Sequence, residues 1–426
     1  MESEAKVSQI VEHLFRQEAG KMISALTARF GLRNLELVED AVQEALLKAL
    51  RLWSYGGVPP NPAGWLMQVA RNQAIDQMRR DIRWREREEQ IAREQDLSRA
   101  PDRIAHLSEE EIRDDQLRMI FACCHPAIAP ESQVALTLKL LCGFGVGEIA
   151  HAFLVSAETI AKRLTRARQR MQKSAIPFEI PSGAGLTSRL DSVLQVLYLL
   201  FNEGYNASQG EELIRRDLCE EAIRLTSLLQ EHPAGDVPKT HALLALLLLQ
   251  TARFSARLNA AGEILLLQEQ DRRTWNHALI TRGMLHLEHA RAGQSVSEFH
   301  LQAGIAACHC AAETYEATDW KKILFFYDLL SELNSSPVIA LNRAVVLFKV
   351  RGPEAGLTAI RQINDRDAMK NYYLYYAVLG ELSLASNQSE EARGNFEQAL
   401  RLTSIPAEEN FLRARLRALP AQSRKF

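Results

Sequence analysis

The sequence lacks the features that mark secreted and membrane-spanning proteins. Six cysteines in a chain of 426 residues do not make the disulfide framework of a small secreted domain. The N-terminal stretch MESEAKVSQI carries acidic residues and has no apolar segment of the kind that a secretory signal needs. The longest apolar run, around Ala242 to Leu249, is too short to cross a bilayer. These absences predict a cytoplasmic protein with reduced thiols and no membrane partner.

Strand-like alternation of apolar and polar residues is also missing, and runs of β-branched residues are scarce. Leu, Ala, Arg and Glu dominate instead, with 47% hydrophobic and 24% charged residues, an ordinary globular mixture. The chain is longer than a single hydrophobic core usually serves. We therefore predict an all-α fold with several domains.

The motifs of several enzyme classes are absent. The sequence contains no Walker loop, Gly-rich dinucleotide turn, nucleophile elbow or paired His–carboxylate zinc motif. In Cys308–Cys310 (CHC), residues two apart face opposite sides of a helix and no second ligand pair follows, so we predict core packing rather than metal binding. Cys123–His125 (CCH) precedes a proline and is expected to end a helix. We expect neither an enzyme nor a cofactor or metal.

Basic residues are clustered even though the net charge is only −2. The stretch from Glu158 to Lys173 contains six basic residues and a single acid. Seven arginines, with acids interspersed, lie between Trp65 and Arg93. Short basic helices in a nearly neutral chain are typical of local DNA contacts.

Breaks rich in glycine and proline, together with changes of pattern, divide the chain into segments. Residues 7–84 have helical periodicity, interrupted by SYGGVPPNP at Ser54–Pro62. Residues 85–115 lose that period and are expected to form an acidic linker, whereas residues 116–175 regain it and end in a basic helix. The break IPFEIPSGAG, at Ile176–Gly185, predicts a boundary before a last helical domain, residues 186–426.

The last domain shows weak internal repetition. A tetratricopeptide-like pattern of two packed antiparallel helices fits the offsets of Tyr376, Leu379, Gly380, Ala392, Phe396 and Ala399. The preceding unit has Ala344, Gly356 and Ile360 at equivalent offsets. The pattern predicts small residues where helices approach closely and large residues between them. An irregular helical bundle remains the alternative, because residues 186–330 fit the pattern poorly.

The clearest local signal is VGEIAHAFLVSAETIAKRLTRARQRM, at Val146–Met171. It predicts a short helix over Gly147–Phe153, a turn, and a second helix with Ser156 as N-cap and with Ile160 and Leu164 on one face. This is the pattern of a helix-turn-helix whose second helix enters the major groove. The residues expected to contact DNA are Ser156, Glu158, Thr159, Lys162, Arg163 and Arg166. The alternative is a solvated basic face on a structural helix.

Two further motifs precede it, VEDAVQEALLKALRLW and NPAGWLMQVARNQAIDQMRRDIRW. Together with the helix-turn-helix they resemble regions 2 and 4 of the extracytoplasmic-function sigma factors of the sigma-70 family, over residues 7–175. The resemblance implies that an E-D-x-x-Q-E helix binds the β′ clamp helices of bacterial RNA polymerase core, and that region 4 meets the β flap. The matching polymerase-binding residues are Glu39, Asp40, Gln43 and Glu44. By themselves, these residues would be interpreted as a solvated helix face.

The resemblance also implies contacts with double- and single-stranded promoter DNA. The second motif corresponds to the segment that melts and reads the minus-ten element, and the loop Ser54–Asn61 to a pocket for a flipped-out base. The expected minus-ten residues are Tyr55, Asn61, Arg71, Asn72, Arg79, Arg80 and Arg83; the helix-turn-helix residues would bind the minus-thirty-five element. Asn72 and Asp76 could instead serve local packing, and Trp53 and Trp65 are expected in the core.

Residues 186–426 resemble the extension of a sigma-factor subgroup with a tetratricopeptide-like C-terminal domain. The matching stretches are LYLLFNEGYNAS (Leu197–Ser208) and SPVIALNRAVVL (Ser336–Leu347). The resemblance implies that this domain controls activity in place of a separate anti-sigma protein, and repeats of this kind bind a peptide or protein ligand. The sequence thus predicts a promoter-specific sigma factor. Two alternatives are a helix-turn-helix regulator without sigma function and a helical-repeat scaffold.

Overall fold

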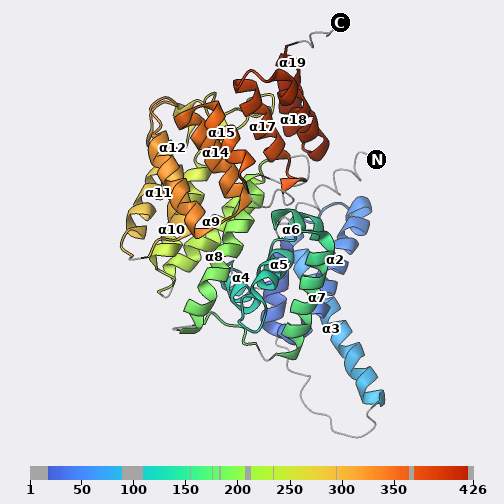
Figure 1. The fold of residues 1–426 in the computed structure, drawn as a ribbon. Coiled ribbons are helices and arrows are strands. Elements are labelled where there is room, and N and C mark those ends of the chain that lie inside the picture. Colours follow the sequence, from blue (N-terminus) through green and yellow to red (C-terminus); the bar gives the residue numbers. More distant parts are fainter. Residues whose placement is uncertain are drawn as a thin grey trace. The chain divides into compact units, whose positions relative to one another are not determined.

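A computed structural model of the chain consists of helices joined by turns. It describes residues 18–88, 109–153, 155–174, 176–181, 184–206, 213–233, 235–293, 295–363 and 369–420. Within these ranges no strand is found, and extended pairing is limited to an isolated bridge between Leu258 and Ile264. The predicted all-α fold is confirmed (Figure 1). The chain divides into two compact units, Met1–Val196 and Leu197–Phe426.

The first unit begins with a helix over residues 18–30. The elements that follow are η1 (Leu32–Asn34), α2 (Leu35–Gly56), α3 (Pro62–Glu88), α4 (Glu109–Cys123), α5 (Pro130–Leu141), α6 (Val146–Ala152), α7 (Ala157–Lys173) and the first part of α8 (Ala184–Tyr205). Helix α2 packs on α3 and buries Val38, Val42 and Leu46, as their helical spacing predicts. It continues through Ser54 and ends at Gly56, because Gly57 adopts a φ of 78°. The expected loop is therefore shorter than Ser54–Pro62.

The N-terminal helices of this unit pack directly on the later ones. Helix α7 contacts both α5 and η1. The helix over residues 18–30 approaches α5 so closely at Gly20 that a Cβ there would lie 1.9 Å from the carbonyl oxygen of Leu141. Only glycine permits this backbone approach. Residues 18–56 and 130–173 therefore share one core.

The division between the two units falls inside α8, whereas we expected it at Ile176–Gly185. The first half of α8 belongs to the first unit, and its Leu186, Leu190 and Val193 are buried. In addition, Nη1 of Arg189 donates a hydrogen bond of 3.2 Å to the carbonyl oxygen of Phe121. A break rich in proline and glycine marks a turn, but the packing of the next helix decides where a compact unit ends.

The second unit is a succession of helices in which neighbours along the chain pack on one another (Figure 1). After the end of α8 they are α9 (Arg216–Glu231), α10 (Pro238–Thr251), α11 (His277–Ala290), α12 (Glu298–Ala311), α13 (Trp320–Leu333), α14 (Pro337–Arg351), α15 (Pro353–Arg361), α17 (Tyr373–Ala385), α18 (Ser389–Leu402) and α19 (Pro406–Ala418). The short 3-10 turns η3 (Phe254–Ala256) and η4 (Arg272–Thr274) connect α10 to α11. Proline opens α10, α14, α15 and α19, where its missing N–H costs no helical hydrogen bond.

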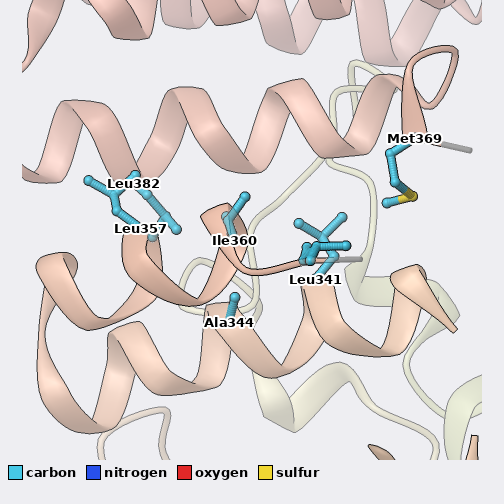
Figure 2. Close-up of a cluster of buried hydrophobic side chains, with 7 residues drawn as sticks. Leu341, Ala344, Leu357, Ile360, Met369 and Leu382 are labelled. Carbon is cyan, nitrogen blue, oxygen red and sulfur yellow. The ribbon is translucent and has the colours of Figure 1, made fainter. Parts of the chain in front are cut away.

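The predicted pairing of small with large residues is confirmed where α14 meets α15 and where α17 meets α18. A Cβ at Gly356 would lie 2.8 Å from Cβ of Phe348, and one at Gly380 would lie 2.5 Å from the ring of Phe396. Figure 2 shows a buried hydrophobic cluster to which α14 contributes Leu341 and Ala344, α15 contributes Leu357 and Ile360, and α17 contributes Leu382. These helices pack closely because glycine and alanine occupy the crossing points.

The two cysteine-containing segments behave as predicted. On α12, Cys308 packs against the cluster that contains Ile323, while Cys310 packs against the cluster that contains Leu249, so the two thiols face different sides. Helix α4 ends at Cys123. In the described part of the chain, no helix is both long enough and apolar enough to span a membrane.

Candidate functional site

Three of the four residues predicted to bind polymerase lie exposed on α2. Asp40, Gln43 and Glu44 face solvent, while Val38 and Val42 on the opposite side of the helix are buried. The helix thus presents a polar surface that does not contribute to the core. We call Asp40, Gln43 and Glu44 the acidic face of α2.

Glu39 differs from its neighbours because it is buried. Its side chain is 7% exposed, and Oε1 accepts a hydrogen bond of 2.9 Å from Nη2 of Arg168 on α7. Burial raises the pKa of Glu39, and the positive charge of Arg168 opposes this rise. In this conformation, almost none of the Glu39 side chain is exposed to a second protein.

Sequence reasoning missed the role of Arg168. The buried stripe of α7 consists of Ile160, Leu164, Ala167 and Met171. Arg168 follows Leu164 by four residues and therefore lies beside this stripe, at the edge of the surface that packs on the rest of the unit. That position could have indicated an arginine that stabilises the fold rather than one that contacts DNA.

The turn before α7 has the predicted local structure. The hydroxyl of Ser156 accepts a hydrogen bond of 3.2 Å from the backbone N–H of Thr159, so the predicted N-cap is confirmed. The two hydroxyls, Ser156 Oγ and Thr159 Oγ1, lie 2.9 Å apart. Both residues thus help to fix the start of α7. Leu154, in the predicted turn, lies outside the described residues.

The predicted DNA-contacting cations of α7 differ in their surroundings. Arg166 is exposed. Lys162 is also exposed, and its Nζ lies 2.6 Å from Oε1 of Glu158 one turn earlier. The guanidinium of Arg163 lies 5.8 Å from the ring centroid of Phe153 and is half-buried. Helix α7 therefore presents Lys162 and Arg166 outward, while Arg163 is held against α6 and its following turn.

Most of the predicted minus-ten residues of α3 that the structure describes are exposed. Arg79 and Arg80 are exposed, and Oδ1 of Asp76 lies 3.9 Å from Nη1 of Arg79. Asn72 is exposed and accepts a hydrogen bond of 3.2 Å from Gln68. Arg71 is half-buried, and the side chain of Arg83 lies outside the described residues.

The end of α2, just before the loop to α3, carries a highly exposed aromatic residue. Tyr55 is 92% exposed in the last turn of α2. Oδ1 of Asn61 accepts a hydrogen bond of 2.9 Å from the backbone N–H of Gly64, so this side chain caps the start of α3. The rings of Trp53 and Trp65 lie 5.4 Å apart; Trp53 is buried, as predicted, and Trp65 is half-buried. Most of the predicted linker, residues 89–108, lies outside the described residues.

Comparisons with known proteins cover both units. Residues 14–85 match the family described as Sigma-70 region 2. Residues 189–291 match a family of unknown function, DUF6596. An uncharacterised protein of Rhizobium meliloti (strain 1021) is 40% identical over 395 residues, which cover 92% of each chain. No solved structure matches the chain.

The first match defines the class of protein. It includes α2 and most of α3 and supports a sigma-70 family factor with a sigma-factor-like role in transcription initiation. The chain belongs to the same family as the Rhizobium meliloti protein, since the two are similar over 92% of their lengths. The second match begins within α8, close to the division between the two units.

Proposed function

We propose that this protein is an extracytoplasmic-function sigma factor, which directs core RNA polymerase to specific promoters and carries its own regulatory domain. The observation that carries this proposal is the match of residues 14–85 to Sigma-70 region 2, the range that holds the acidic face of α2 and the arginines of α3. The exposed cations of α7 add a second basic surface in the same unit.

In this proposal, the acidic face of α2 binds the β′ clamp helices of core polymerase. Asp40, Gln43 and Glu44 are exposed and contribute little to packing, which supports a role in binding. Glu39 can join them only when its carboxylate leaves Arg168. Polymerase binding through Glu39 and the packing of α7 on the N-terminal helices therefore compete.

Two surfaces of the same unit contact the promoter in this proposal. Arg71, Asn72, Arg79, Arg80 and Arg83 of α3 bind the minus-ten element. Tyr55, which is exposed, stacks on an unpaired base. Asn61 takes part only if its side chain leaves the cap of α3.

The helices α6 and α7 act as the helix-turn-helix of region 4. They bind the minus-thirty-five element through Ser156, Glu158, Thr159, Lys162, Arg163 and Arg166. The exposure of Lys162 and Arg166 supports contacts of these two with bases or phosphates. The position of the Arg163 guanidinium over the ring of Phe153 supports a positioning role for Arg163 beside them. Region 4 also meets the β flap.

The second unit modulates this activity in the same chain. Its close crossings at Gly356 and Gly380 are those that a tetratricopeptide-like stack requires. Such stacks offer extended surfaces for a peptide or protein ligand. A ligand of this unit would provide the signal that a separate anti-sigma protein gives elsewhere.

The proposal is tested by transcription with purified components. The full chain is added to core polymerase and a library of promoter fragments, and the transcripts are sequenced. A sigma factor yields transcripts that share sequence elements upstream of their start sites. A helix-turn-helix regulator that is not a sigma factor would bind DNA without binding core polymerase, and a scaffold would bind neither. Either result would reject the proposal.

A further inference from the structure

The second unit contains a cavity of about 190 Å³ in which four helices each contribute one side-chain amide. The four amides are Asn202 on α8, Gln250 on α10, Gln302 on α12 and Asn342 on α14. Among the described residues that line the cavity, none is charged. Asn342 is exposed, so the lining of the cavity reaches the protein surface at α14.

The hydrogen-bonding groups of these amides are only partly used by hydrogen bonds within the protein. Oε1 of Gln250 is buried and has no hydrogen-bond partner. Oε1 of Gln302 accepts a hydrogen bond of 2.7 Å from the hydroxyl of Tyr198. A buried polar atom without a partner is uncommon, because it loses its hydration and gains nothing in exchange. The wall formed by Gln250 therefore has an acceptor available for a ligand.

Aromatic side chains form the remaining polar walls. Tyr198, Tyr205 and Tyr327 line the cavity, and the rings of Phe201 and Tyr205 are stacked with centroids 5.9 Å apart. Burial raises the pKa of Tyr327, so its hydroxyl stays neutral and keeps its proton. Flat aromatic faces beside amides favour a flat group with hydrogen-bonding edges.

We propose that this cavity binds an uncharged ligand through a planar amide group that carries both a carbonyl acceptor and an N–H donor. Each side-chain amide offers one acceptor and two donors and so pairs with both edges of such a group. A charged ligand would lose its hydration without meeting an opposite charge on the described lining. The group can come from the main chain of an extended peptide or from a small molecule with the same chemistry. The inference concerns residues of the second unit alone and does not depend on a role in transcription.

The probe is N-acetyl-L-alanine methylamide, which consists of two peptide units around one small side chain and suits a cavity of this size. Binding to the full-length chain is followed by ligand-observed NMR, and the position is checked in soaked crystals. We expect weak binding, with a Kd in the millimolar range, as for other ligands of few atoms. N-acetyl-L-alanine with a free carboxylate is the charged counterpart and is expected to bind at least about tenfold more weakly, because its charge is desolvated without a partner.

Gln250→Met and Gln302→Met remove one amide each while keeping an unbranched side chain. Each is expected to weaken binding of the blocked alanine about three- to tenfold, the loss of one hydrogen bond. Gln398→Met changes a half-buried amide on α18, outside the cavity, and should leave the Kd unchanged. If a cavity variant fails to fold, as judged by circular dichroism, Asn342→Ala on the exposed rim replaces it.

A blocked tetra-alanine distinguishes the two sources of the amide group. Tighter binding of the longer peptide supports a peptide segment as the natural ligand. Binding of the short probe alone supports a small molecule with the same chemistry. The proposal is overturned if neither probe binds, if the free carboxylate binds as well as the blocked form, or if the cavity variants bind like the wild-type chain.

Discussion

Glu39 and Arg168, 129 residues apart in the sequence, form a hydrogen-bonded ion pair between α2 and α7. The pair connects a helix of the Sigma-70 region 2 match with α7, which carries six basic residues and one acid. Its carboxylate is almost completely buried, whereas a quarter of the Arg168 side chain is exposed, 27%. The proposed polymerase contact of Glu39 is therefore coupled to the packing of the N-terminal unit.

We expect Arg168→Met to destabilise the N-terminal unit by about 3 kcal/mol, because it leaves a buried carboxylate without its partner. The double variant Glu39→Gln/Arg168→Met should recover much of that loss, since neither charge remains. The single variant Glu39→Gln completes a double-mutant cycle, in which the urea unfolding of each variant is followed by tryptophan fluorescence. Additive losses in this cycle would show that the two side chains do not interact.

The acidic face of α2 should matter for polymerase and not for folding. Asp40→Ala/Gln43→Ala changes two exposed side chains, so the free energy of unfolding should stay within about 0.5 kcal/mol of the wild type. Copurification with core polymerase should fall. Glu36→Ala, an exposed change in the first turn of the same helix, is the matched control. Undiminished polymerase binding by the double variant would remove the acidic face from the proposed interface.

Arg166 should contribute to promoter recognition more than Lys173, although both are exposed cations of α7. If Arg166 contacts a base, Arg166→Ala should weaken promoter binding by the polymerase complex by about 1–3 kcal/mol. If it contacts phosphate, the loss should be equal for all sequences and the salt dependence should flatten. Binding is measured at several salt concentrations with cognate and scrambled fragments. No loss for either fragment would contradict the proposed recognition helix.

The crossing of α17 and α18 should not tolerate a methyl group. Gly380→Ala places a Cβ 2.5 Å from the ring of Phe396, which is itself fully buried, and should cost about 1–3 kcal/mol. Gly394→Ala, in the interior of α18, meets nothing within 4 Å and should stabilise the domain by up to about 1 kcal/mol. Thermal unfolding of the two variants is compared. A Gly380→Ala variant as stable as the wild type would mean that the helices separate easily.

The second unit should lose stability on acidification through His286. Burial, together with His241 and other nearby groups, lowers the pKa of His286 from 6.5 to about 4. The unfolded chain therefore binds a proton at this residue that the folded chain does not. The free energy of unfolding therefore keeps the full contribution of the neutral His286 above pH 6.5. It loses this contribution as the pH falls toward 4, because protonation favours the unfolded chain.

His286→Gln should make the unfolding free energy less dependent on pH across this window. His277→Gln changes an exposed histidine at the start of the same helix and is the control. Nδ1 of His286 lies 2.9 Å from Nδ1 of His241, so one ring must donate and the other accept. Equal pH profiles for the wild type and His286→Gln, measured by urea unfolding at a series of pH values, would contradict the assignment.

The sequence by itself determined the local structure of this protein. The apolar period of α2, the cap at Ser156 and the end of α4 at Cys123 depend on residues within one or two turns of each other. Such interactions leave a pattern in consecutive residues, because helices have a fixed repeat and fixed requirements at their ends. The small and large residues of α17 and α18 were predicted for the same reason, as members of a repeating unit.

Only the tertiary structure decided which polar residues are accessible and where the two units divide. Glu39 and Asp40 are neighbours with the same charge, yet one is buried against Arg168 and the other is exposed. The first half of α8 packs with the first unit, past the break at Ile176–Gly185. These outcomes depend on contacts between residues far apart in the chain, which no local period records. The sequence therefore predicted the helices, and their packing determined which side chains remain available for a partner.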